Sequence, residues 1–303
     1  GRCSFISVTL AIRLGPTLQS DGPIGSSMAD LVQPTAQFKT QDDLPSEVTV
    51  ALVQLCSEET EPTADRIERA LSLATQAAQS ADLVVLPELW LAGAFDVQAS
   101  GRLAQPLKGP LVQQFQDLAT RHQTWIHMGS IAEREARFTY NTSVLINAHG
   151  QVGYTYRKRH LFGFEGGELD VMTAGEELVV ANTPIGPAGL ATCYDLRFPE
   201  QFRSLVDLGA TAFLMASGWP TERIEHWRVL LQARAIENQA WMIACNGVGT
   251  QCGTTLGGRS AVIDPLGKVV AEAGTEEELL FAQVNPSAAT AWRTEFPTLM
   301  DRR

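Results

Sequence analysis

The chain has 303 residues, a hydrophobic content of 45% and a formal net charge of −11 at pH 7. A chain of this length can bury a large core, so we expect one large domain, with two domains as the alternative. The acidic balance disfavours nucleic acid as a partner, and no apolar run approaches the roughly 18 to 20 residues that a membrane-spanning helix needs.

The first 46 residues differ from the rest of the chain. They mix Gly, Pro, Ser, Thr and Gln without a sustained period. Residues 3–14 are apolar, but they lack the long apolar stretch and the cleavage pattern of a signal peptide. We therefore expect 1–46 to be a disordered or non-native leader, with a targeting segment as the alternative and Met28 as a candidate start. Residues 47–303 are expected to form the folded domain.

From residue 48 the sequence alternates between strand-like and helix-like segments. The predicted strands are 48–55, 83–86, 125–130, 143–147, 152–156, 189–193, 212–216, 242–246, 260–263, 269–273 and 279–284. The predicted helices are 64–80, 111–122, 198–208 and 224–239. Turn signals at 147–150 and 264–267 join neighbouring strands. Hairpins mixed with βα units predict an α/β fold with two sheets and helices outside them.

One cysteine, Cys193, lies where a predicted strand meets a predicted helix. A side chain at such a turn leaves the sheet, and free backbone N–H groups can meet a negative charge there. A lone cysteine is as often a buried structural residue, so this position alone predicts no chemistry.

Two other fragments supply the groups that a thiol nucleophile needs. Glu88 ends an apolar strand just after Pro87, and Lys158 lies in a cationic cluster at 157–160. Taken singly, they would be a loop carboxylate and a solvated charge. Together with Cys193 they provide a nucleophile, a base for its proton and a cation for an oxyanion.

The cysteines argue against a disulfide framework and a zinc site. They are odd in number, widely scattered and without a Cys-x-x-Cys pair: Cys3, Cys56, Cys193, Cys245 and Cys252. This usage favours a reducing compartment, and we expect a cytoplasmic protein.

The segments 84–90, 156–162 and 191–200 resemble, in the same order, the three signature regions of the nitrilase (carbon–nitrogen hydrolase) superfamily. The resemblance extends over about residues 47–303 and implies a four-layer α-β-β-α sandwich with a Glu-Lys-Cys triad. It implies that Glu88 is the general base, Lys158 the lysine and Cys193 the nucleophile. It also implies that no metal or organic cofactor is needed.

The same resemblance suggests further site residues. The family's second glutamate matches Glu168, with Glu165 as the alternative, and the backbone N–H of Tyr194 matches an oxyanion donor. Trp219 would wall the substrate pocket or belong to the core. The other polar motif residues are expected to support the fold or to pair with one another: Ser130, Asn141, His160, Asp195 and Arg197.

The residues after Cys193 resemble the Nit-type, omega-amidase-like amidases, whereas nitrilases proper follow the cysteine with Trp-Glu. We therefore expect the substrate to be the amide of a small carboxylic acid, cleaved through a cysteine thioester. A nitrile or an N-carbamoyl compound is the alternative, and a catalytically silent binding protein is a further one. The resemblance also implies a homodimer or a larger homo-oligomer.

Overall fold

The computed structural model describes residues 44–163 and 167–303. Most of the predicted leader, with Met28 and Cys3, and the alternative glutamate Glu165 lie outside the described residues, and the boundary at residue 47 stays a prediction. The described residues all belong to one compact unit. Among their helices, none is both long enough and apolar enough to cross a membrane.

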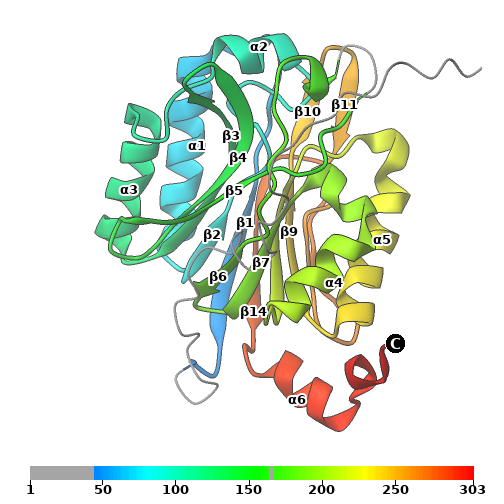
Figure 1. Ribbon diagram of the computed structural model, residues 1–303. Coiled ribbons are helices and arrows are strands. Elements are labelled where there is room, and N and C mark those ends of the chain that lie inside the picture. Colours follow the sequence, from blue (N-terminus) through cyan, green and yellow to red (C-terminus); the bar gives the residue numbers. More distant parts are fainter. Residues whose placement is uncertain (1–43, 164–166) are drawn as a thin grey trace, which may run out of the picture. The chain divides into compact units, whose positions relative to one another are not determined.

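Two six-stranded sheets form the centre of the fold (Figure 1). The first sheet has the order β14 (Glu278–Val284), β1 (Val48–Gln54), β2 (Leu83–Val85), β3 (Trp125–Glu135), β4 (Phe138–Ile146) and β5 (Val152–Arg157). The second has the order β13 (Val269–Glu272), β12 (Ala261–Ile263), β9 (Trp241–Asn246), β8 (Ala212–Ser217), β7 (Gly186–Thr192) and β6 (Val180–Thr183). A separate hairpin pairs β10 (Val248–Gln251) with β11 (Thr254–Gly257).

Helices cover the outer face of each sheet. On the first sheet lie α1 (Thr63–Ala78) and α3 (Pro110–His122), and on the second lie α4 (Pro199–Asp207) and α5 (Ile224–Asn238) (Figure 1). A short α2 (Val97–Arg102) and a C-terminal α6 (Ala288–Glu295) complete the helices of the described residues.

The alternation of side chains along β1 shows how the layers are joined. Ala51 and Val53 belong to the core that the first sheet forms with α1 and α3. Val50 and Leu52 belong to the core between the two sheets, because successive side chains of a strand point to opposite faces. A third core joins the second sheet to its own helices. The predicted four-layer α-β-β-α sandwich is therefore confirmed.

Most predicted elements are present, with differences at their ends. Strands β3 and β4 are longer than expected, because they continue to pair as far as Glu135 and Phe138. The strand expected over 189–193 stops at Thr192, and Cys193 begins a 3₁₀ helix, Cys193–Arg197. The elements that the sequence did not predict are α2, β6, β10, β11 and α6.

Four strands end at one edge of the sandwich. Glu88 follows β2, Lys158 follows β5, Cys193 follows β7 and Gly218 follows β8. The Glu88 N–H donates to the carbonyl of Ser217, 3.3 Å away, and this bond links the two sheets at that edge. Residues far apart in the sequence thus meet at one place.

Candidate active site

Glu88 is held in a tight turn after β2. The Ser130 N–H donates to the carbonyl of Pro87 (3.3 Å), and the Leu89 N–H donates to Ser130 Oγ (3.1 Å). Gly129 lies against this turn with φ +69°, where an added Cβ would be 1.9 Å from the Pro87 oxygen. The Glu88 carboxylate is buried, and its Oε2 accepts from the Gly218 N–H at 2.9 Å. The base predicted from sequence therefore has a fixed position.

Lys158 is buried between two carboxylates. Its Nζ lies 2.7 Å from Glu88 Oε1 and 2.7 Å from Glu168 Oε2. Asn141 Nδ2 donates to the same two residues, at 2.8 Å to Glu88 Oε1 and 2.7 Å to Glu168 Oε1. The Phe162 N–H donates to Glu168 Oε2 at 2.7 Å. One cation and two neutral donors thus neutralise and fix a pair of buried carboxylates.

Burial and charge act against each other in this cluster. Burial alone would lower the pKa of Lys158, but Glu168 and Glu88 raise it well above its usual value, so the ammonium stays charged. Burial raises the pKa of Glu168, Lys158 opposes that rise, and Glu88 adds to it. The cluster therefore keeps its cation, and the pKa of Glu168 lies above its usual value.

Cys193 adopts a left-handed backbone conformation, φ +45°, at the start of its 3₁₀ helix. Its side chain is buried with about 9% of the residue exposed. Burial raises the pKa of the thiol, and the nearby Glu88 raises it further, whereas Lys158 and a contact with Ser217 lower it. The thiol therefore keeps its proton at rest, and a base must remove that proton as the sulfur attacks.

A second polar network supports the turn that carries Cys193. Asp195 accepts hydrogen bonds from the Thr192 N–H (2.9 Å) and the Tyr156 hydroxyl (2.6 Å). Asp195 Oδ1 also lies 2.7 Å from His160 Nδ1. Because Tyr156 and His160 flank Lys158 in sequence, Asp195 ties the cysteine turn to the lysine segment.

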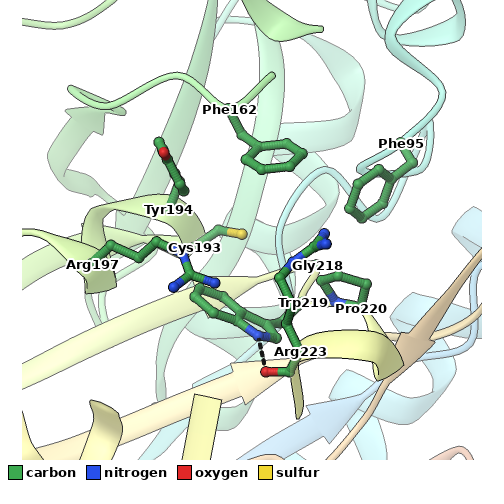
Figure 2. A pocket seen from close by; sticks show the side chains of 9 residues that line it. All are labelled: Phe95, Phe162, Cys193, Tyr194, Arg197, Gly218, Trp219, Pro220 and Arg223. Atoms are coloured by element: carbon green, nitrogen blue, oxygen red, sulfur yellow. Dashed lines mark hydrogen bonds between the residues drawn. The ribbon is translucent and has the colours of Figure 1, made fainter. Parts of the chain in front are cut away.

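A small cavity opens onto Cys193 (Figure 2). Its walls are mainly apolar and include four aromatic residues, and among the described residues they carry two arginines and no acidic side chain. They consist of Phe95, Phe162, Cys193, Tyr194, Arg197, Gly218, Trp219, Pro220 and Arg223. Cys193 is one of the lining residues, so an acyl group attached to its sulfur would lie in this cavity.

The structure brings together the residues that the sequence singled out. Glu88, Lys158 and Glu168 form one cluster, with Cys193 beside it. Tyr194 and Trp219 both line the cavity that opens onto Cys193.

The structure distinguishes between the two expectations for the polar motif residues. Asp195 and Arg197 do not pair with each other. Asp195 contacts Tyr156 and His160 instead. The Arg197 guanidinium lies 4.8 Å from the centre of the Trp219 ring. Asn141 supports the fold as a strand residue of β4, but its amide also contacts both buried carboxylates.

Sequence reasoning missed Phe95, Phe162 and Arg223 as lining residues of the cavity. Phe162 belongs to the sequence motif that contains Lys158, so its position near the site could have been inferred. Phe95 and Arg223 carry no such signal. Across residues 44–163 and 167–303, no group of three or more His, Cys, Asp or Glu side chains could hold a metal ion.

The chain is similar to known proteins over most of its length. The family model described as "Carbon-nitrogen hydrolase" matches residues 49–294. A 2-oxoglutaramate amidase of Paenarthrobacter nicotinovorans is 39% identical over 265 residues, which cover 85% of this chain and 90% of that protein.

Two solved structures extend the comparison. Saccharomyces cerevisiae Nit3, a member of branch 10 of the nitrilase superfamily, matches with a TM-score of 0.76 and 30% identity, over 84% of this chain and 96% of that one. A variant amidase of Nesterenkonia sp. AN1, with an acetamide moiety added covalently at its active-site cysteine, matches with a TM-score of 0.72 and 26% identity, over 86% and 96%.

Proposed function

The chain belongs to the carbon–nitrogen hydrolase family, and we propose that it hydrolyses the amide of a small carboxylic acid at Cys193. The observation that carries the proposal is the buried cluster in which Lys158 Nζ lies 2.7 Å from both Glu88 and Glu168, beside a thiol that faces a small cavity. A cluster of buried charges is expensive to desolvate, and a site that moves protons has a use for it.

In the first half of the proposed reaction, Glu88 takes the proton of the Cys193 thiol while the sulfur attacks the amide carbonyl. A C–S bond forms, and the negative charge on the carbonyl oxygen is stabilised by Lys158 and the Tyr194 N–H. The tetrahedral intermediate collapses, the C–N bond breaks, and the leaving ammonia takes the proton from Glu88. A thioester on Cys193 remains.

In the second half, water replaces ammonia. Glu88 takes a proton from the water, whose oxygen attacks the thioester carbonyl, and the C–S bond then breaks. The proton on Glu88 returns to the sulfur, and the carboxylic acid leaves. In this scheme Glu168 positions Lys158 by accepting from its Nζ, and Asn141 positions Glu88 and Glu168 by donating to both carboxylates.

The alternatives have less support. Two of the three proteins named above are amidases, and one of these is named for an amide that carries a carboxylate. A nitrile or an N-carbamoyl substrate would use the same residues, but neither is favoured by an observation in this chain. In a catalytically silent binding protein, the buried Glu88–Lys158–Glu168 cluster would cost desolvation energy and serve no function.

Ammonia release from a panel of small amides tests the proposal. We expect the wild-type chain to release ammonia from at least one ω-amide. Cys193→Ala should abolish turnover, and Lys158→Met should lower it by about 10²- to 10³-fold, as the loss of an oxyanion donor does. Cys252→Ala, at an exposed cysteine, is the matched control. Undiminished turnover by Cys193→Ala, or product from nitriles with every amide intact, would contradict the proposal.

We further propose a homodimer or a larger homo-oligomer in a reducing compartment such as the cytoplasm. The four described cysteines are free: Cys56, Cys193, Cys245 and Cys252. Large apolar side chains are exposed on α5 and the C-terminal segment, among them Val229, Ile236, Phe296 and Met300, the last 84% exposed. Their burial against a second copy of the chain would remove this apolar surface from water. Sedimentation of the full chain would reveal a monomer if the proposal is wrong.

A further inference from the structure

Ser217, the last residue of β8, has a hydroxyl without a partner. The residue has no exposed surface, and its Oγ makes no hydrogen bond to any of the described residues. A buried hydroxyl that makes no hydrogen bond destabilises the folded state, whereas an alanine at the same position would not. A local cost of this kind is expected where a residue serves a function.

The register of the second sheet places this hydroxyl beside the nucleophile. Strands β7 and β8 run parallel, with Thr192 opposite Ala216. Cys193 and Ser217 are therefore the next two residues along these strands. Because neighbouring strands lie about 4.8 Å apart, side chains at such positions are within reach of each other when they leave the same face of the sheet.

The two side chains do lie on the same face. Phe213 and Met215 pack in the core that the second sheet forms with its helices, and Leu214 packs in the core between the two sheets. Since side chains alternate along a strand, Ser217 shares the face of Phe213 and Met215. Cys193 belongs to the same core as these two residues. The hydroxyl is thus a neighbour of the sulfur, and it lowers the pKa of the Cys193 thiol.

The carboxylate of Glu88 has other donors. Its Oε2 accepts from the Gly218 N–H at 2.9 Å, and its Oε1 accepts from Lys158 Nζ and Asn141 Nδ2. The backbone of Ser217 is itself held at this edge, because its carbonyl accepts from the Glu88 N–H at 3.3 Å. The Ser217 hydroxyl is therefore fixed next to the sulfur and is not used by the base.

The sulfur gains a need for a donor when it becomes negatively charged. A thiol is a weak hydrogen-bond acceptor, whereas a hydrogen bond to an ionised group is shorter and stronger than one to a neutral group. The Lys158 ammonium is shared between Glu88 and Glu168, so it does not serve the sulfur alone. A neutral donor on the sulfur's own sheet would add to the stabilisation of the thiolate.

We propose that the Ser217 hydroxyl donates a hydrogen bond to the Cys193 sulfur while the sulfur carries negative charge. In the first half of the reaction, Glu88 takes the thiol proton, the C–S bond forms, and Ser217 keeps its own proton. In the second half, the C–S bond breaks, the electron pair stays on the sulfur, and the same hydroxyl stabilises it until the proton on Glu88 returns. This inference rests on the proposed function, because it adds a residue to the same reaction.

Alkylation of Cys193 by iodoacetamide tests the inference without amide turnover. A C–S bond forms as iodide leaves, the thiolate is the reacting species, and mass spectrometry follows the modification at Cys193. We expect Ser217→Ala to slow alkylation by about 10-fold, and to lower kcat/KM for ammonia release by a similar factor, as the loss of a hydrogen bond to a charged group does. The midpoint of urea unfolding should stay equal or rise, because alanine removes a hydroxyl that the resting protein leaves unpaired.

The matched control is Ser100→Ala on α2. Ser100 is also fully buried with an unpartnered Oγ, and it is absent from the lining of the cavity at Cys193. This variant should leave both rates unchanged. Because the control also removes a buried, unpaired hydroxyl, a loss of rate confined to Ser217→Ala would come from the position beside the sulfur.

Two results would overturn the inference. The first is alkylation of Ser217→Ala at the wild-type rate. The second is a lower unfolding midpoint, or a failure to fold, of Ser217→Ala, which would assign the hydroxyl a structural role. A wild-type chain that releases ammonia from no amide would refute the proposed function, whereas the alkylation rates would still decide whether Ser217 stabilises the thiolate.

Discussion

His127 should make the fold sensitive to mild acid. It lies on β3 between Val85 of β2 and Leu145 of β4, with no exposed surface. Its Nδ1 accepts a hydrogen bond from the Gly129 N–H at 3.3 Å, so the neutral ring carries its hydrogen on Nε2, which has no partner among the described residues. Burial lowers the pKa of His127 from 6.5 to about 4.

The magnitude follows from linkage. The unfolded chain binds a proton at this histidine as the pH falls below about 6.5, whereas the folded chain does not until about pH 4. Stability is therefore fully present above about pH 6.5 and is lost as the pH falls towards about 4. A difference of about 2.5 pH units at about 1.4 kcal/mol each gives a full loss of about 3.5 kcal/mol, of which about 3 kcal/mol is reached at pH 4.

The assay is urea denaturation of the wild type and His127→Asn at several pH values between about 7 and 4. Asparagine keeps an acceptor near the position of Nδ1 but cannot take up a proton, so the variant removes only the pH-dependent part. We expect the wild type to lose about 3 kcal/mol more than His127→Asn over this range, whatever the absolute cost of the substitution. Parallel pH profiles for the two proteins would refute the reasoning.

Two further predictions concern the turns that carry the site residues. Gly129→Ala should destabilise the fold by about 3 kcal/mol or more and impair ammonia release, because the added Cβ would lie 1.9 Å from the Pro87 oxygen. The control Gly101→Ala lies on a helix with open space around the new atom and should stabilise the fold by about 0.5–1 kcal/mol. Equal midpoints of urea unfolding for the two variants would contradict this prediction. Tyr156→Phe should cost about 1–3 kcal/mol in thermal or urea unfolding, because Asp195 loses a buried hydrogen bond, and an unchanged midpoint would show that the hydroxyl contributes nothing.

The periodicity of the sequence predicted the elements that carry large apolar side chains. The strands that pack in the three cores contain Val, Leu, Ile and Ala runs, and three of the four long helices, α1, α3 and α4, have a clear apolar face. The missed hairpin β10–β11 is rich in Gly and Thr, and β6 is a four-residue edge strand. Such short polar segments become strands through pairing with a partner, and local sequence does not reveal that partner.

Some features of the site could likewise be predicted from the sequence, and others could not. Glu88, Lys158 and Cys193 could be predicted because each follows a strand and the three together form a complete chemical set. The contacts of the Asn141 amide with Glu88 and Glu168 could not be predicted, because the sequence of a strand does not show which strand ends its polar residues will face. Here β4 pairs with β5, and that register places Asn141 beside the start of the lysine segment, where the Lys158 N–H donates to its carbonyl at 2.8 Å.

The arginines of the cavity have a property that the local sequence does not show, namely the absence of acidic side chains from the described lining. Arg223 in sequence is one basic residue between Glu222 and Ile224, and a nearby acid would suggest a paired surface charge. In the fold, Trp219 anchors the Arg223 backbone, and the described lining contains no acid to neutralise the guanidinium. A motif can identify the residues that react, whereas the charge balance of the cavity depends on side chains that only the fold brings together. The nucleophile motif is shared by enzymes with different substrates, so discrimination among them is expected to arise from such unpaired groups across the cavity.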